Sequence, residues 1–317
     1  MSRVIRRSFA LALLAVLVAA SLAATPAAGR QADPTPVEIS MLAAEPTAQS
    51  MYAKHRAMFS KQGIAATLKI LADPSQIVAA LLAGDVEFIA TPAANVAVLK
   101  SKGAPVKVVA AGATYDPKAP NSGLVSAKGK TIRGARDLVG KTIAIDFPNT
   151  IADLGVKEWL ERNGVDPKDV KITYVPFQQM LGPLAQGTVD AGFVPEPYLT
   201  TALQQGSKRI ASPFNAVCSQ RCLLTFWVAR TDVDPNLAAR FRNAIQNASV
   251  WANQPKNDEA SGKILARYVP IDAAVLKKMV RTRFGTRLRP SLAQPWLDLY
   301  AKHDLIPASF KAIDLVK

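Results

Sequence analysis

Short continuous apolar runs alternate with longer segments of helical periodicity over the first third of this chain. The apolar runs predict strands at 37–42, 64–72, 86–90 and 106–112. The segments between them predict helices at 49–63, 74–85 and 91–103. Gly63 suits the left-handed cap that ends a helix, and Pro92 suits the first turn of one. This alternation indicates a parallel sheet covered by helices.

The same alternation starts again near residue 131. A short helix is predicted at 131–140, and strands are predicted at 141–146, 171–176 and 189–194. Helices are predicted at 149–164, 177–187 and 195–206. Another strand follows at 223–230, and helices are predicted from there to the last residue. The pattern therefore predicts a second α/β unit in the same chain.

Two stretches of the chain resemble each other. LLAGDVEFIATP at 81–92 aligns with LAQGTVDAGFVP at 184–195 after a shift of 103 positions. The shift superposes a glycine, a valine and a proline of each stretch, and it places the acidic Glu87 on Asp190. Ligands of open α/β sheets bind outside the carboxyl ends of the strands. We therefore expect the turns at 91–95 and 194–198 to face one cleft; generic α/β spacing is the alternative explanation.

The first 29 residues have the pattern of a secretory signal peptide. Three arginines precede an apolar run of 12 residues at 9–20, which is too short for a membrane-spanning helix. Cleavage is expected after Ala23 or Gly29, and 30–35 should form a flexible leader. The general secretory route is favoured, because the twin-arginine motif is incomplete. Since no cysteine lies near the cut, we predict a periplasmic protein that is not a lipoprotein.

The exported part of the chain is basic. The net charge of +15 falls to about +12 without the signal, which holds three positive charges. Nucleic acid is excluded as a partner, because the chain is exported and its basic residues are mostly scattered. The exception is KKMVRTRFGTRLR at 277–289, for which we predict a solvated helix face, with anionic lipid or a partner protein as the alternative.

Cys218 and Cys222 are the two cysteines of the chain. In an oxidising compartment so close a pair predicts a local disulfide that closes a small ring. A redox-active pair is the alternative, although the spacing is not C-x-x-C. A metal site is not expected, because the two histidines, His55 and His303, are distant in sequence.

Motifs of common enzyme classes are missing from the sequence. It contains no G-x-S-x-G, no phosphate-binding loop, no G-x-G-x-x-G and no H-E-x-x-H. A nucleophile–base pair would need one of the two histidines, and neither follows a predicted strand. We therefore predict that the chain is not an enzyme and uses no cofactor.

Five segments in order resemble the substrate-binding proteins of bacterial ABC importers. They are the signal peptide, 81–95, 135–146, 184–200 and 297–316. The branch they resemble is NMT1/THI5-like and serves sulfonates, taurine, nitrate and pyrimidine precursors of thiamine. The resemblance implies a type II periplasmic-binding fold, in which two α/β lobes are joined by two crossing strands around a ligand cleft. Lobe 1 is expected at 36–122 plus 226–317, and lobe 2 at 123–225.

The resemblance also implies that turns at the strand ends hold the ligand. The expected ligand-binding residues are Glu45, Thr47, Thr91, Pro92, Ala93, Tyr115, Asp146, Phe147, Asn149, Thr150, Glu196 and Tyr198. Helix N-termini near these turns would suit an anion. The three carboxylates would repel an anion and suit an ammonium, an amidine or the donor edge of a heterocycle, although each could instead serve a helix start. Together they favour an amine-bearing or pyrimidine-like ligand.

The implied function is capture of a small molecule by hinge closure and its delivery to ABC permease subunits in the inner membrane. ATP would be hydrolysed by another polypeptide, and the binding protein is expected to be a monomer. A sensor that presents its ligand to a membrane receptor is the alternative. A pyrimidine-synthase-like enzyme is disfavoured, because the cysteine-rich segment of that enzyme is missing here.

Overall fold

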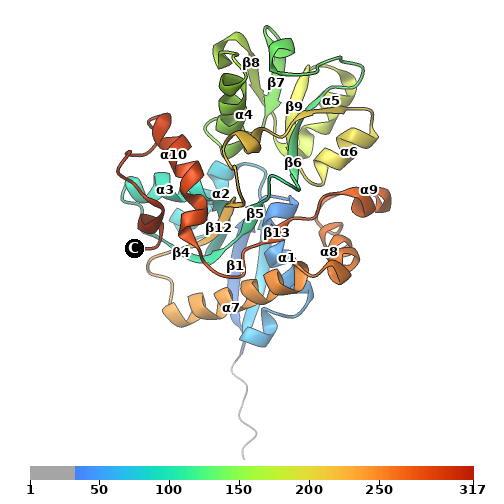
Figure 1. Ribbon diagram of the computed structural model, residues 1–317. Coiled ribbons are helices and arrows are strands. Elements are labelled where there is room, and N and C mark those ends of the chain that lie inside the picture. Colours follow the sequence, from blue (N-terminus) through green and yellow to red (C-terminus); the bar gives the residue numbers. More distant parts are fainter. Residues whose placement is uncertain (1–32) are drawn as a thin grey trace, which may run out of the picture. The chain divides into compact units, whose positions relative to one another are not determined.

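The computed structural model describes residues 33–317, which contain two five-stranded sheets and one three-stranded sheet (Figure 1). The strands are β1 (Thr35–Met41), β2 (Ile64–Ile70), β3 (Phe88–Pro92), β4 (Val106–Ala111), β5 (Ala113–Tyr115), β6 (Ser122–Ser126), β7 (Thr142–Ile145), β8 (Lys171–Tyr174), β9 (Ala191–Pro195), β10 (Lys208–Ala211), β11 (Cys222–Leu223), β12 (Thr225–Arg230) and β13 (Arg283–Phe284). The α-helices are α1 (Gln49–His55), α2 (Pro74–Ala83), α3 (Ala93–Ser101), α4 (Ile151–Arg162), α5 (Leu181–Gln186), α6 (Tyr198–Gln204), α7 (Pro235–Ala252), α8 (Asp258–Leu265), α9 (Ala273–Lys278) and α10 (Gln294–Lys302). The expected signal peptide at 1–29 lies outside the described residues.

The first five-stranded sheet has the order β2-β1-β3-β12-β4. Strand β1 is parallel to β2 and β3, and β12 is antiparallel to β3 and β4. Helix α7 packs against this sheet, and Phe241 stacks on Phe88 with ring centroids 3.8 Å apart. Asp234 caps the start of this helix, because its carboxylate accepts a hydrogen bond from the backbone N–H of Leu237.

The second five-stranded sheet has the order β10-β6-β9-β7-β8. Strand β7 is parallel to β8 and β9, whereas β6 is antiparallel to β9 and β10. All five strands come from one continuous stretch of chain, 122–211. These two helix-covered sheets confirm the α/β two-lobe fold.

The small third sheet, β11-β5-β13, carries both passages of the chain between the larger sheets. Strand β5 follows β4 of the first sheet and precedes β6 of the second. Strand β11 follows β10 of the second sheet and precedes β12 of the first. Figure 1 shows β5 and β13 at the level where the two larger sheets meet.

The acidic residue that the two copies of the internal repeat share has the same structural role in both. It lies just before a strand and accepts a hydrogen bond from the backbone of the neighbouring strand. Glu87, just before β3, accepts a hydrogen bond from the backbone N–H of Glu38 at 2.7 Å. Asp190, just before β9, accepts one from the backbone N–H of Thr142 at 3.0 Å. The glycine that ends the preceding helix is left-handed in both copies, with φ of 88° and 72°. Each acid therefore fixes its short strand against the neighbouring parallel strand, β1 or β7.

Two helix predictions were wrong in length. The helix expected at 49–63 ends at His55, because Ala57 adopts a left-handed φ of 57° and only a 3-10 turn, Ser60–Gln62, follows before Gly63. The helix expected at 131–140 is reduced to the 3-10 turn Ala135–Leu138.

The prediction of a solvated helix face for the basic run 277–289 was also wrong. Helix α9 ends at Lys278, and β13 follows within the run. Most of these basic side chains therefore project from a strand and its flanking loops. Among the described residues, no helix has the length and apolar character needed to cross a bilayer.

Candidate functional site

A cavity of about 80 Å³ lies between the carboxyl ends of the strands of the two larger sheets. The first sheet and its flanking segments contribute Leu42, Ala44, Pro46, Thr47, Pro74, Ala90, Pro92, Asn95, Leu224 and Thr225. The second sheet and its flanking segments contribute Asn121, Ser122, Asp146, Thr150, Ile151, Ala152, Phe177, Phe193, Pro195 and Phe214. The two turns of the internal repeat thus meet at one cavity, where ligands of open α/β sheets bind.

Two hydrogen bonds join the sheets beside the cavity. The Tyr198 hydroxyl donates to the backbone carbonyl of Ala43 at 2.8 Å. The backbone N–H of Glu45 donates to the carbonyl of Glu196 at 3.3 Å. These bonds hold the strand ends of the two sheets close together around the cavity.

Asp146 is the ionisable side chain among the described residues that line this cavity. It directly follows β7, is 5% exposed, and accepts a hydrogen bond from the Thr150 hydroxyl at 2.7 Å. Burial raises the pKa of Asp146 to about 6, although the hydrogen bonds from Thr150 and from the Phe147 backbone act in the opposite direction. The cavity therefore holds a carboxylate that burial penalises whenever it is charged.

Two further polar groups at the cavity have free hydrogen-bonding capacity. Asn121 donates through Nδ2 to the Thr282 hydroxyl at 2.9 Å, but its Oδ1 has no hydrogen-bond partner among the described residues. The Ser122 hydroxyl also lacks one there. Both residues are more than nine-tenths buried. Because an unsatisfied buried polar group costs about 1–3 kcal/mol, a ligand that bonds these atoms removes that cost.

The remaining walls of the cavity are mainly apolar. Phe177, Phe193 and Phe214 contribute aromatic surface from the second sheet and its flanking turns. Phe214 is fixed against Phe193 at 4.9 Å and edge-on to Trp296 at 4.8 Å between ring centroids. No lysine or arginine lines the cavity among the described residues. The site therefore combines one carboxylate and a few neutral polar groups with mainly apolar walls.

The expected ligand-binding residues divide into two groups in the structure. Those that line the cavity are Thr47, Pro92, Asp146 and Thr150. Those that do not are Glu45, Thr91, Ala93, Tyr115, Phe147, Asn149, Glu196 and Tyr198. Of the three carboxylates that suggested a cationic ligand, the structure places Asp146 at the cavity.

Glu45 is fully buried in an ion pair with Arg281, which lies two residues before β13 of the third sheet. Its Oε1 accepts a hydrogen bond from Nε of Arg281, and its Oε2 accepts one from the backbone N–H of Thr282 at 2.8 Å. Both carboxylate oxygens are therefore occupied by protein donors.

Glu196 connects the second sheet to the segment just before β13, which also contains Arg281. Its Oε1 accepts hydrogen bonds from the Thr200 hydroxyl at 2.8 Å and from the Val280 backbone at 3.2 Å. Its Oε2 accepts one from the Thr200 backbone at 3.1 Å. Burial raises the pKa of Glu196, and these donors act against the rise.

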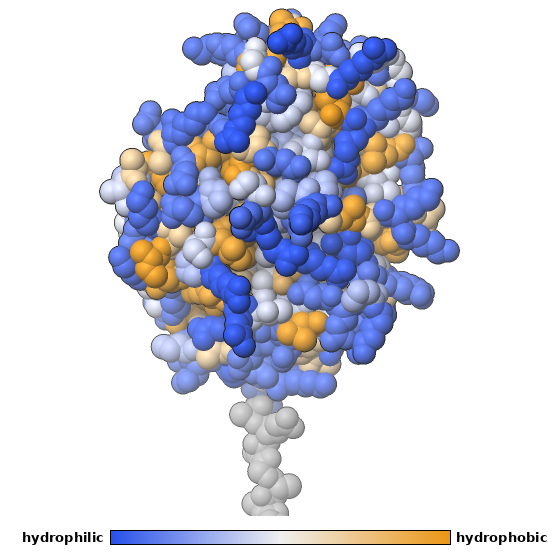
Figure 2. Space-filling model, viewed as in Figure 1, coloured by the Kyte–Doolittle hydropathy of each residue, from blue (hydrophilic) through white to orange (hydrophobic). Residues whose placement is uncertain are grey.

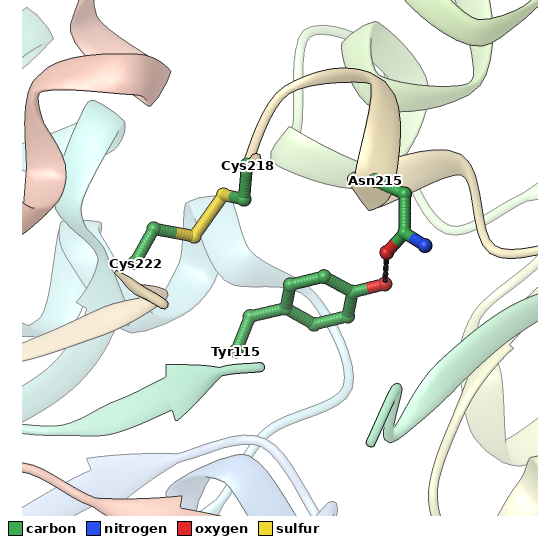
Figure 3. Close-up of a disulfide and its surroundings, with 4 residues drawn as sticks. All are labelled: Tyr115, Asn215, Cys218 and Cys222. Carbon is green, nitrogen blue, oxygen red and sulfur yellow. Dashed lines mark hydrogen bonds between the residues drawn. A yellow bond between two sulfur atoms is a disulfide. The ribbon is translucent and has the colours of Figure 1, made fainter. Parts of the chain in front are cut away.

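Tyr115 lies beside the disulfide rather than at the cavity (Figure 3). Its hydroxyl donates to Oδ1 of Asn215. The structure joins Cys218 to Cys222, with their Cα atoms 6.0 Å apart, which ties the turn after Asn215 to the start of β11.

The other expected residues have structural partners of their own. Phe147 and Asn149 line a surface hollow that adjoins the cavity and shares Pro74, Asn95 and Thr150 with it. In this hollow the Tyr300 hydroxyl donates to the Asn149 carbonyl at 2.7 Å. Thr91 accepts a hydrogen bond from the Asn95 side chain at 3.4 Å, and the Ala93 backbone donates to the Leu224 carbonyl.

Several cavity residues were not predicted from the sequence. Phe193 could have been found, because it stands two positions before Pro195 on β9 and alternate residues of a strand share a face. Asn121 and Ser122 stand at the start of β6, where the sequence gives no sign that the chain has just entered the second sheet. Phe177 and Phe214 lie in 3-10 turns and carry no periodic signal.

The family model described as NMT1/THI5 like matches residues 47–258, and this chain belongs to that family. The matched range includes parts of both larger sheets and most of the residues that line the cavity.

Two curated relatives and one solved structure illustrate the similarity. The taurine-binding periplasmic protein of Escherichia coli K12 is 27% identical over 194 residues, which are 58% of each chain. The nitrate/nitrite binding protein NrtA of Synechococcus elongatus is 27% identical over 143 residues, or 44% of this chain and 32% of the relative. This chain thus spans between about a third and three fifths of the length of these relatives. The periplasmic aliphatic sulphonate binding protein SsuA of E. coli shares the fold, with a TM-score of 0.68, 19% identity, and coverage of 90% of this chain and 98% of that one.

Proposed function

We propose that this protein binds a small solute in the cavity between its two larger sheets and delivers it to an ABC importer. Membership of the NMT1/THI5-like family supports this function, as do similar proteins named for binding taurine, nitrate and sulphonates. These relatives are binding proteins and not enzymes. A periplasmic location and permease partners in the inner membrane follow from the same likeness.

The mechanism we propose is closure of the two lobes around the ligand. The cavity has walls from both larger sheets, so a bound molecule contacts both lobes at once. Such contacts exist only in the closed form, and their free energy shifts the population toward closure. The bond from Tyr198 to the Ala43 carbonyl would form in the same movement.

The ligand we propose is small, has an apolar part, and presents a cationic or strongly donating group to Asp146. The buried Asp146 carboxylate, with no lysine or arginine lining the cavity among the described residues, is the observation that carries this assignment. An anion would meet a like charge in a poorly solvated site. A cavity of about 80 Å³ holds several water molecules, which limits the ligand to a compact amine, amidine or pyrimidine-like compound.

A ligand screen with the mature chain, residues 30–317, tests this assignment. Thermal shift would compare small amines, amidines and thiamine-type pyrimidines with nitrate, taurine and alkyl sulfonates. A ligand at a thousand times its dissociation constant stabilises the protein by about 4 kcal/mol. We expect a hit in the first group, and titration calorimetry should show at least tenfold weaker binding to Asp146→Asn, since a charge-assisted hydrogen bond contributes about 1.5–3 kcal/mol.

Asp190→Asn is the matched control for this screen. It makes the same chemical change at a residue outside the cavity, so it should leave ligand affinity unchanged. A nitrate or sulfonate hit whose affinity is the same in wild type and Asp146→Asn would refute the ligand assignment. In that case the first turn of α3, which has no side-chain cap, would be the better candidate for the contact.

The transport role needs a separate measurement. The loaded protein should stimulate ATP hydrolysis by its ABC importer, permease and ATPase subunits together, reconstituted in proteoliposomes. The unloaded protein should stimulate it less. Stimulation of a receptor without any effect on an importer would favour the sensor instead.

A further inference from the structure

Four arginines surround a hollow on the third sheet, away from the cavity. We call it the arginine hollow; it is lined by Arg221, Arg283, Arg287 and Arg289 and has a volume of about 670 Å³. It shares no lining residue with the cavity. Figure 2, viewed as in Figure 1, shows strongly hydrophilic side chains gathered over the region of β5 and β13.

Gly285 helps to place the C-terminal part of the basic run at the arginine hollow. Its backbone N–H donates to the Gly112 carbonyl at 2.8 Å, just before β5. A Cβ added to Gly285 would lie 2.7 Å from the Cβ of Ala111, so the chain approaches β4 more closely than a larger residue allows. This contact fixes the loop after β13 and directs Arg287 and Arg289 to the rim of the hollow.

The four guanidinium groups differ in how many hydrogen bonds and ion pairs they form with the protein. Arg221 pairs with Asp116 at 2.7 Å. Arg283 donates to the Asn253 carbonyl at 2.8 Å and lies 3.9 Å from a carboxylate oxygen of Asp258.

Arg287 and Arg289 form neither an ion pair nor a side-chain hydrogen bond with any described residue, and both are exposed. With Asp116 and Asp258 counted, the hollow keeps an excess of two positive charges. Four like charges around one recess repel one another unless an anion is shared between them.

We propose that the arginine hollow is a second binding site, which takes a small multivalent anion of the tricarboxylate or phosphate type. Guanidinium groups present several donors in a plane and bind carboxylate and phosphate oxygens in pairs. A compact anion with three carboxylates or several phosphate oxygens satisfies Arg287 and Arg289 together with the free donors of Arg221 and Arg283. The recess suits a compact solute better than a flat lipid surface.

Titration calorimetry of the mature chain with trisodium citrate and with inorganic pyrophosphate tests the site. The buffer would be of low ionic strength, with sodium chloride of equal ionic strength as the blank. We expect saturable binding of one anion, weakened at least tenfold in the double variant Arg287→Gln/Arg289→Gln. Asp146→Asn should leave the anion titration unchanged, so this result is independent of the proposed solute function.

Lys277→Gln/Lys278→Gln is the matched control. It removes the same charge from the same basic run, at exposed positions outside the hollow. Equal weakening by both double variants would overturn the proposal, because net charge alone would then explain the binding. The proposal would also be overturned if neither citrate nor pyrophosphate bound saturably. Co-sedimentation with phosphatidylglycerol vesicles, in place of citrate binding, would overturn it too.

Discussion

Replacing Asp146 by asparagine should stabilise the ligand-free protein at neutral pH while it weakens ligand binding. Burial raises the pKa of Asp146 from its ordinary value of 3.8 to about 6. The folded chain therefore binds more protons than the unfolded chain between these two values, and its stability falls as the pH rises through them. Above pH 6 the penalty is complete, and the difference in pKa corresponds to about 3 kcal/mol.

Asparagine removes the charge and keeps an oxygen that can accept the hydrogen bond from Thr150. We expect Asp146→Asn to unfold at a temperature several degrees above the wild type at pH 7.5. The difference should shrink toward zero near pH 3.5, where the wild-type carboxyl is mostly protonated in both states. Thermal or urea unfolding of the two proteins at both pH values measures it.

Asp190→Asn provides a control of opposite sign. The Thr142 backbone N–H, together with Lys130, lowers the pKa of Asp190, so its charged form stabilises the fold. The same substitution there should lower stability at pH 7.5. The reasoning on Asp146 fails if its asparagine variant is less stable than wild type at pH 7.5, or if the stability difference is the same at both pH values.

Three further substitutions test other contacts. Arg281→Met should lower the free energy of unfolding by about 3–5 kcal/mol in urea titrations, because it leaves the buried Glu45 charge without its partner; an unchanged midpoint would contradict the ion pair. Gly285→Ala should cost about 1–3 kcal/mol through its contact with β4, whereas Gly182→Ala, where nothing lies within 4 Å, should not destabilise the protein. Glu196→Gln should change ligand affinity less than Asp146→Asn in calorimetry, since its side chain does not line the cavity; an equal loss would place Glu196 at the ligand.

The order of strands and helices was predictable because each element depends on its own apolar pattern and on local caps. The repeat around Glu87 and Asp190 was predictable for the same reason, since a fixed shift brings the two copies into alignment. Its physical basis was not predictable, because the acid bonds to a strand about 48 residues away in each copy.

The candidate site was only partly predictable. Asp146 directly follows β7 and Pro92 is the last residue of β3, so topology alone predicts that they lie at the cavity. Glu45 also follows a strand, but its partner Arg281 is 236 residues away and no local pattern announces it. The helix prediction for the basic run 277–289 was wrong, because part of the run forms β13 and pairs with β5. Tertiary contacts therefore decide which polar residues at the strand ends remain free for a ligand.

The placement of β12 has a consequence for the order in which the chain can fold. All strands of the second sheet lie within 122–211, so that sheet can form as one continuous unit. In the first sheet, β12 pairs with both β3 and β4, so neither pairing exists until residues 225–230 have joined. Pairing across so long a separation is slow, and unpaired strand edges attract other chains. A chain that ends before residue 225 would therefore keep all strands of the second sheet. In the first sheet, the edges of β3 and β4 would remain unpaired and prone to aggregation.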